Sequence, residues 1–542
     1  MRRVIIRRMN ITFSRREFLY IAGAGALGAR SVFGADTYVI ADTTSGKVRG
    51  VEIEGIKMFK GVPYGGNTAG RNRFMPPTPP AKWTGVRDAL EYGASAPQTE
   101  PGRGRNANDL AVAGAGLPAE SEDCLVLNVW TPALNDGKKR PVMVWCHGGG
   151  FATGSGSSPI TAGFNLARRG DVVVVTLNHR LNVLGFTNLS EPGGPDFSSS
   201  SDVGMMDIVQ ALQWVRDNIT RFGGDPGTVT IFGQSGGGRK VATLLAMPSA
   251  KGLFHRAIIE SGATLRLVEK DQGTRVAQEL MKTMGLEKTQ VKDLQMAPIE
   301  RLMAAYFETM RRMNVDQMTM GFSPGVDGRV IPQHPVYPTA SAISADVPLM
   351  LGSTRTELTL QSAAELFTLD DAGMRKRIGD LLGKGAAATI DAYTKANPGA
   401  SPSDLYFLIA SDYRYSGPVM TIADRRSALN KGPVYLYYWR WETPVDGGRL
   451  KAPHTIEIPF AFDNIQAAKR LTGGGAEAVA LADKVSDTWL AFARTGNPNQ
   501  PKLPAWTKYN STDRPTMVFD TQSALVNDPI RDQRLAIFKV MS

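Results

Sequence analysis

Short apolar runs rich in β-branched residues alternate along the chain with longer stretches of helical periodicity. Three of the apolar runs are Pro141–Cys146, Asp171–Leu177 and Thr228–Phe232. Continuous runs of this kind are typical of parallel strands that are covered on both faces. The stretch Asp207–Asn218 instead has apolar side chains at i, i+3, i+4 and i+7 from Ile208, which form one stripe of a helix. The alternation predicts an α/β fold, with a large and mostly parallel central sheet covered by helices on both faces.

Glycine and proline mark the boundaries of the other segments. The segment Gly223–Pro226 is expected to end the 207–218 helix and to turn the chain into the next strand. Residues 101–120 are predicted to form a long exposed loop, and residues 265–320 a Met-rich helical insertion. No repeat or charge block divides the sequence after its N-terminal region, so residues 35–542 are predicted to form one domain.

The N-terminal region is similar to an export signal. Arg15 and Arg16 precede a mildly apolar run, Tyr20–Ala29, and small residues follow at Gly34 and Ala35. This order resembles a twin-arginine signal. The apolar run is shorter than the roughly 20 residues that a membrane helix needs. An amphipathic surface helix is the alternative.

The signal implies that residues 1–34 are removed, with cleavage near Gly34 or Ala35, and it fits a start at either Met1 or Met9. We therefore expect a periplasmic or secreted protein without a stable membrane anchor. Its partner during export would be the twin-arginine machinery, which carries proteins that have already folded.

The charge balance does not favour a nucleic-acid partner. The formal net charge is +11, and the seven arginines and one acid of residues 1–35 supply more than half of it. Two cysteines exclude a disulfide scaffold and a cysteine-based zinc site, and five histidines leave little material for another metal centre. No metal or other cofactor is expected.

The predicted strand Thr228–Phe232 leads directly into a glycine-flanked serine. Residues 233–237 read G-Q-S-G-G, with Ser235 at the centre, and an apolar stretch at a helix start follows at Val241–Met247. A strand–serine–helix turn is a nucleophile elbow, in which small neighbours permit the sharp turn and the hydroxyl stays exposed above the sheet edge. A structural glycine turn is the alternative.

A second glycine run follows the strand Pro141–Cys146. Residues 147–151 read H-G-G-G-F, so no side chains stand beside the backbone N–H groups of Gly149 and Gly150. Such a turn can direct N–H groups at an oxyanion. It could instead bind phosphate, but neither G-x-x-x-x-G-K-[ST] nor a spaced G-x-G-x-x-G follows.

Together these segments resemble the type-B carboxylesterase family, which includes bacterial para-nitrobenzyl esterases and, more distantly, cholinesterases. The resemblance rests on E-D-C-L at 122–125, the HGGGF run, N-H-R-L at 178–181, F-G-G-D-P at 222–226 and the serine elbow. It extends from F-K-G-V-P-Y at 59–64 to G-N-P-N at 496–499. The family implies an α/β-hydrolase fold and a carboxylic-ester hydrolase activity.

The resemblance also indicates an acid and a base. The family's acid closes a G-x-x-x-x-E turn, which here ends at Glu357, and its base opens an H-x-x-E-x-P-[FY] pattern, which here begins at His454. Thr356 and Leu358 depart from the residues usual beside the acid. The order Ser235, Glu357, His454 is the α/β-hydrolase order, so these residues are the predicted catalytic triad.

The chemistry assigns each residue a role. Ser235 would attack the ester carbonyl, His454 would act as general base and then acid, and Glu357 would orient the imidazole. The oxyanion would be bound by the amides of Gly149, Gly150 and Gly236.

Ser261 matches a family serine that hydrogen-bonds the acid, although an ordinary turn serine is the alternative.

Small to medium carboxylic esters are the expected substrates. Residues 99–123 contain no Trp, so the cation–π platform of cholinesterases is missing, and Gln234 stands where Glu is common in the family. An amidase or peptidase on the same scaffold is an alternative, as is a non-catalytic cholinesterase-like binding protein. Cys124 and Cys146 are predicted to be buried, unpaired thiols.

Overall fold

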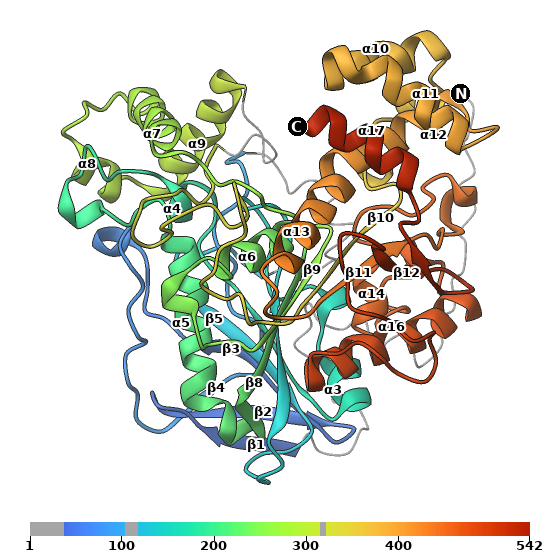
Figure 1. Cartoon of the computed structure of the whole chain (residues 1–542). Coiled ribbons are helices and arrows are strands. Elements are labelled where there is room, and N and C mark those ends of the chain that lie inside the picture. Colours follow the sequence, from blue (N-terminus) through green and yellow to red (C-terminus); the bar gives the residue numbers. More distant parts are fainter. Residues whose placement is uncertain (1–36, 103–117, 315–320) are drawn as a thin grey trace, which may run out of the picture.

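A 13-stranded mixed sheet runs through the centre of the protein in the computed structural model, which describes residues 37–102, 118–314 and 321–542 (Figure 1). The strands are β1 (Thr37–Asp42), β2 (Lys47–Ile53), β3 (Ile56–Pro63), β4 (Val86–Asp88), β5 (Val126–Thr131), β6 (Arg140–Cys146), β7 (Val173–Leu177), β8 (Gly224–Gln234), β9 (Arg256–Glu260), β10 (Leu349–Thr354), β11 (Val434–Trp439), β12 (Pro515–Phe519) and β13 (Ala524–Asn527).

The strand order is β1-β2-β3-β5-β7-β6-β8-β9-β10-β11-β12-β13, with β4 beside β2. The strands from β7 through β6, β8, β9, β10 and β11 to β12 pair in parallel. The pairs β1-β2, β2-β3, β3-β5, β5-β7 and β12-β13 are antiparallel, and β4 pairs with β2 in parallel. The predicted α/β fold with a large, mostly parallel sheet is confirmed.

Helices cover both faces of this sheet. They are α3 (Phe164–Gly170), α4 (Asn182–Phe186), α5 (Val203–Asn218), α6 (Gly236–Leu244), α7 (Lys270–Thr283), α8 (Val291–Met296), α9 (Ile299–Met313), α10 (Asp371–Leu382), α11 (Ala386–Ala396), α12 (Pro402–Ser411), α13 (Gly417–Ser427), α14 (Ile458–Ala461), α15 (Lys469–Thr472), α16 (Ala476–Thr495) and α17 (Arg531–Met541).

The period-two alternation of the strands divides the core into two layers. Val142 and Val144 of β6 pack with α5, α6 and α13 on one face, whereas Met143 and Trp145 pack with α3, α14 and α16 on the other. All four side chains are almost completely buried. A strand covered on both faces reads as a nearly continuous apolar run, which is the pattern that residues 141–146 show.

Two element boundaries differ from the sequence-based expectation. The helix expected at 207–218 begins at Val203, because its first turn is also buried against the core. The Gly223–Pro226 segment is only partly a turn: Gly223 has a φ of +73°, but β8 already begins at Gly224, which pairs with Arg140 of β6.

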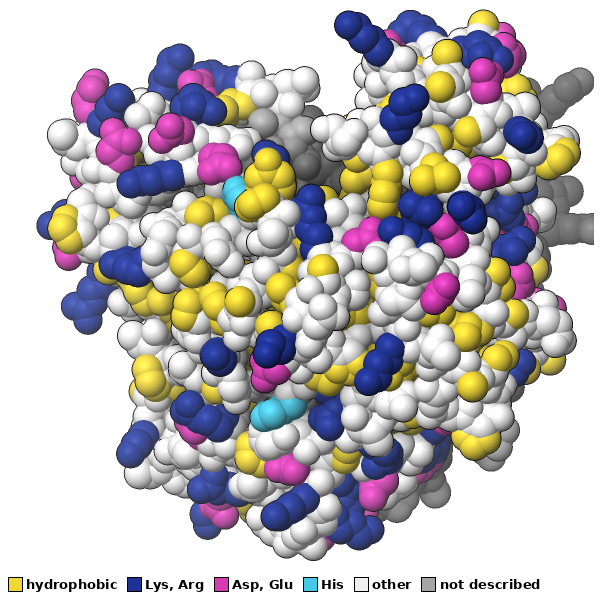
Figure 2. Space-filling view, in the orientation of Figure 1, with side chains coloured by type: hydrophobic (Ala, Val, Ile, Leu, Met, Phe, Trp, Pro, Cys, Tyr) yellow, Lys and Arg dark blue, Asp and Glu magenta, His cyan; other side chains and the backbone are white. Residues whose placement is uncertain are grey.

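Two helical groups lie at the same end of the molecule, on opposite sides (Figure 1). One contains α7, α8 and α9, in the region predicted as a helical insertion. The other contains α10, α11, α12 and α17, which share a separate apolar cluster. The sequence pattern did not predict this cluster. The molecular surface is hollowed between the two groups, and on this face basic and acidic side chains are interspersed (Figure 2).

Several expectations fall outside the described residues. These are the export signal at 1–34, most of the predicted loop at 101–120, and the last part of the predicted insertion, 315–320. Within the described ranges, none of the helices has the length and apolar character needed to cross a membrane.

Candidate active site

Ser235 is the single residue between β8 and α6. It has φ +57° and ψ −122°, a strained conformation for a residue with a side chain, and its N–H donates to the carbonyl of Glu260 at 2.8 Å. The two residues that follow it are glycines because there is no room for a Cβ atom. A Cβ on Gly236 would lie 2.2 Å from the carbonyl oxygen of Gly150, and one on Gly237 would lie 2.0 Å from the backbone of β6. The strand–serine–helix turn predicted from the sequence is present.

The glycine run after β6 meets the start of α6. Gly149 and Gly150 have φ values of +84° and +62°, and Thr153 N–H closes their turn on the carbonyl of Gly149 at 3.0 Å. Over the ranges that the structure describes, the amides of Gly149, Gly150 and Gly236 have no protein acceptor. Two loops thus bring three unpaired N–H donors to one place, and the positive end of the α6 dipole adds to their attraction for an anion.

Glu357 and His454 are brought together, as the sequence predicts. Glu357 lies in the turn that follows β10, where its Oε1 accepts from the amide of Thr354 at 2.7 Å. Its Oε2 is hydrogen-bonded to Nδ1 of His454. Glu357 is 1% exposed and His454 3%, so water screens this contact little. The contact fixes one ring nitrogen of His454 and leaves Nε2 as the nitrogen that can exchange a proton.

Two side chains border the His454 ring from outside the predicted triad. The amide Nε2 of Gln234 lies 3.2 Å from both ring nitrogens, and the ring of Tyr415 has its centroid 5.0 Å from that of the imidazole. Over the described ranges, no hydrogen bond joins the Ser235 hydroxyl to His454. Catalytic hydrogen bonds are often long until substrate binds.

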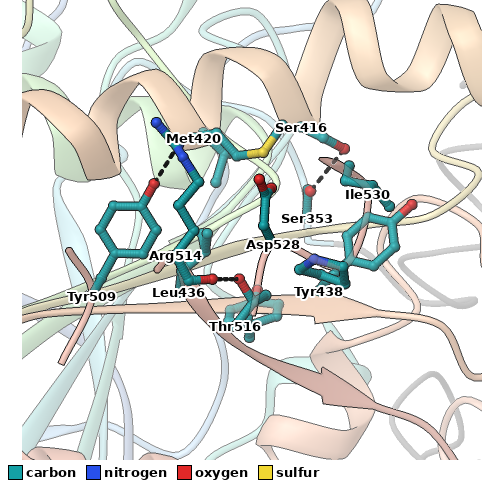
Figure 3. A pocket seen from close by; sticks show the side chains of 13 residues that line it. Ser353, Ser416, Met420, Leu436, Tyr438, Tyr509, Arg514, Thr516, Asp528 and Ile530 are labelled. Atoms are coloured by element: carbon teal, nitrogen blue, oxygen red, sulfur yellow. Dashed lines mark hydrogen bonds between the residues drawn. The ribbon is translucent and has the colours of Figure 1, made fainter. Parts of the chain in front are cut away.

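Tyr415 belongs to a π-helical turn, Asp412–Ser416, which joins α12 to α13. The hydroxyls of Ser353 on β10 and Ser416 are hydrogen-bonded at 3.0 Å, which ties this turn to the strand that leads to Glu357 (Figure 3).

The cavity beside these two serines, of about 20 Å³, has room for about one water molecule. Burial raises the pKa of Tyr415 to about 12, so its phenol stays neutral against the imidazole.

Ser261 does not contact the acid that the resemblance assigned to it. Its Oγ donates to Oε1 of Glu457 at 2.7 Å. Its one hydroxyl proton is therefore given to Glu457 and not to Glu357, so the predicted Ser261–Glu357 hydrogen bond is wrong. Ser261 instead supports Glu457, the acidic residue of the H-x-x-E segment.

Two further carboxyl groups, those of Glu457 and Glu260, are buried near Glu357 and His454. Burial raises the pKa of Glu457 to about 7, with an added contribution from the charge of Glu357. Burial and the charge of Glu457 raise the pKa of Glu260 to about 8, although Glu260 accepts a hydrogen bond from the Trp489 indole at 2.7 Å. One oxygen of each, Oε2, lacks a partner among the described residues. The raised pKa values favour the protonated form of both carboxyl groups.

Cys124 and Cys146 are both unpaired and completely buried, as predicted. Burial raises the pKa of Cys146 to about 12 and that of Cys124 well above its usual range. Neither thiol is a nucleophile near neutral pH. In the part of the chain that the structure describes, no group of three or more His, Cys, Asp or Glu side chains could hold a metal ion.

The fold and this site define an α/β-hydrolase: an elbow serine, a buried acid–base pair and unpaired amides at the ends of parallel strands. The model of the carboxylesterase family matches residues 37–538, and the chain belongs to that family.

Similar proteins include the para-nitrobenzyl esterase of Bacillus subtilis (strain 168), 34% identical over 93% of this chain and 99% of that protein. The phenmedipham hydrolase of Pseudarthrobacter oxydans is 36% identical over 90% of this chain and 97% of that protein. A crystal structure of a Geobacillus stearothermophilus carboxylesterase superposes with a TM-score of 0.79 at 35% identity, covering 92% and 99% of the two chains. The protein is therefore a carboxylic ester hydrolase.

Proposed function

We propose that the protein is an exported serine carboxylesterase that cleaves small to medium esters through an acyl-serine intermediate. The observation that carries the proposal is the buried Glu357–His454 hydrogen bond beside a serine elbow whose Gly236 packs on Gly150. Acyl transfer needs a nucleophile, a base and preorganised donors for the oxyanion, and these groups meet in one place.

In the proposed first step, Ser235 attacks the ester carbonyl while His454 Nε2 takes the hydroxyl proton. Glu357 stabilises the imidazolium that forms, and it holds the ring with Nδ1 protonated. The imidazolium then protonates the leaving alcohol, which leaves an acyl group on Ser235. Water, deprotonated by His454, releases the acid in the second step.

The negative oxygen of each tetrahedral intermediate would accept hydrogen bonds from Gly149, Gly150 and Gly236. Each donor of this kind typically stabilises the transition state by about 3 kcal/mol. The lack of protein acceptors for these amides in the described ranges supports this role.

The expected substrates are neutral or weakly anionic esters. Gln234 places a neutral amide over the imidazole. The names of two relatives, a para-nitrobenzyl esterase and a phenmedipham hydrolase, support an enzyme for compact organic substrates. Export rests on the twin-arginine pattern at Arg15 and Arg16, and buried, unpaired cysteines are compatible with folding in a reducing compartment before export.

Hydrolysis of p-nitrophenyl acetate and butyrate by the wild type and by Ser235→Ala tests the proposal. The wild type should turn over both esters, and the folded variant should lose at least about 10³-fold in kcat. Parallel p-nitroanilide substrates separate an esterase from an amidase. Comparable ester turnover by the folded Ser235→Ala protein would overturn the proposal.

A further inference from the structure

Lys240 is a completely buried lysine on the helix that Ser235 precedes. It lies five residues after Ser235 on α6, and its exposed fraction is 0%. Lysine is almost never fully buried without a charged partner. Burial lowers the pKa of Lys240 to about 7, and no carboxylate of the described residues contributes to offsetting this effect. Because burial of an unpaired charged group costs free energy, the position of Lys240 in the core calls for a functional explanation.

The contacts of Lys240 lie at the two ends of the H-G-G-G-F run. Its Nζ donates to the carbonyl oxygen of His147 at 2.8 Å, and it lies 5.7 Å from the centroid of the Phe151 ring. Both contacts cross from α6 to the segment that carries Gly149 and Gly150. The Lys240 amino group therefore connects the two parts of the chain that supply the proposed oxyanion donors.

The glycine run has few other side-chain anchors near its start. The His147 ring lies on that of His179 with centroids 5.0 Å apart, and its Nδ1 lies 2.8 Å from the carbonyl of Gly148. In the described part of the chain, Nε2 of both histidines is buried without a partner. Burial and the charge of Lys240 lower the pKa of both rings well below the usual range, so they pack as neutral groups. Glycines cannot add side-chain contacts of their own.

We propose that Lys240 is a positioning residue for the oxyanion hole. By holding the His147 carbonyl from α6, it fixes the amides of Gly149 and Gly150 relative to the amide of Gly236, which begins the same helix. This inference rests on the proposed acyl-serine mechanism and adds a residue to it. Lys240 does not touch the substrate, and it acts through the backbone of the glycine run.

The geometry of an oxyanion hole is exacting, since the donors must lie 2.7 to about 3.1 Å from the developing oxyanion, and a misplacement of about 1 Å can cost 10²-fold in rate. The oxyanion exists in the transition state and not in the bound ester. Loss of the Lys240 contact should therefore lower kcat much more than it raises KM.

Lys240→Met tests this inference, because methionine fills similar space without a donor or a charge. The matched control is Thr243→Val on the same helix, which removes a buried hydroxyl that donates only to the carbonyl of Arg239, within α6. For each variant, kcat and KM for p-nitrophenyl butyrate and Ki for a reversible trifluoromethyl ketone would be measured. The ketone forms a tetrahedral adduct whose oxygen occupies the oxyanion hole.

We expect Lys240→Met to lower kcat and ketone affinity by a similar factor, about 10- to 100-fold, with KM changed less than about threefold. Lys240→Gln, whose amide can still donate, should recover part of both, and Thr243→Val should stay within about twofold of the wild type. If Lys240→Met does not fold, Lys240→Gln is compared with Thr243→Val in its place.

A folded Lys240 variant whose kcat and ketone affinity match those of Thr243→Val would overturn the inference. So would a loss of kcat without loss of ketone affinity. Failure of the acyl-serine mechanism itself would be distinguished by a wild type without ester turnover, or by an active Ser235→Ala protein.

Discussion

The amide of Gln234 lies over the face of the His454 imidazole, with its Nε2 3.2 Å from each ring nitrogen. An atom at the same short distance from both nitrogens cannot lie in the plane of the ring, because it would collide with the carbon between them. The in-plane position at Nδ1 belongs to Glu357. Gln234 therefore packs on the base without competing for its proton.

Replacement of this amide by a carboxylate should change the pH dependence of the reaction. In Gln234→Glu, a negative charge over the ring would stabilise the imidazolium, which cannot accept the serine proton. The acidic limb of the kcat/KM profile should move to higher pH by on the order of one pH unit. Gln234→Met, which is neutral and of similar length, should leave the limb in place. Coincident profiles for the wild type and Gln234→Glu would show that this contact has no bearing on His454.

Glu357 and Glu457 should differ in their effect on turnover. Glu357→Gln removes the charge that stabilises imidazolium and should lower kcat about 10²- to 10⁴-fold, but by less than His454→Ala does. Glu457→Gln keeps an acceptor for Ser261 and should stay within about tenfold of the wild type. Steady-state kinetics on folded proteins make the comparison. The reverse ranking of the two glutamates would move the role of the acid to Glu457.

Stability should depend on pH through Glu260. Its pKa is raised to about 8 in the folded protein, above the value of about 4.3 expected in an unfolded chain. Between these values the folded state binds more protons, so its stability is full at acidic pH and declines as pH rises toward 8. Glu260→Gln cannot ionise and keeps an acceptor for the Trp489 indole.

Thermal unfolding at pH 5, 6.5 and 8 tests this account of Glu260. The difference in Tm, variant minus wild type, should increase by on the order of 3 °C between pH 5 and pH 8. A constant difference in Tm at all three pH values would mean that Glu260 does not titrate with folding.

The cysteines should be inert in the native state. Cys124 and Cys146 are buried, and their raised pKa values keep them as thiols. A thiol reagent at pH 8 should modify neither before denaturation and both after it, and dithiothreitol should change neither activity nor Tm. A mass lower by two hydrogens in the non-reduced protein would reveal a disulfide and contradict this expectation.

The sequence predicted those parts of the fold and site that depend on local patterns. Residues 142–146 of β6 and 229–232 of β8 are buried and mostly apolar, and the glycines after Ser235 are needed because the backbone of Gly150 lies against Gly236. The pairing of Glu357 with His454 followed from two motifs 97 residues apart, and it is present in the structure.

Contacts that depend on packing between distant segments could not be predicted from local sequence patterns. Tyr415 reaches His454 from a π-helical turn that has no sequence signature. Ser261 donates to Glu457, whereas Glu357 accepts from the Thr354 amide, and this choice between two glutamates depends on side-chain geometry. Lys240 directly precedes the mostly apolar stretch Val241–Met247, but only its burial shows that it points inward.

The central claim is that Ser235 is the residue that becomes acylated. A fluorophosphonate probe, followed by proteolysis and mass spectrometry, tests it most directly, because the probe forms a stable phosphonyl ester with an activated serine. We predict complete inactivation with one label per chain, located on Ser235, and no label on Ser235→Ala or on the heat-denatured wild type. Labelling of a different residue, or inactivation of the enzyme with Ser235 unmodified, would contradict the account.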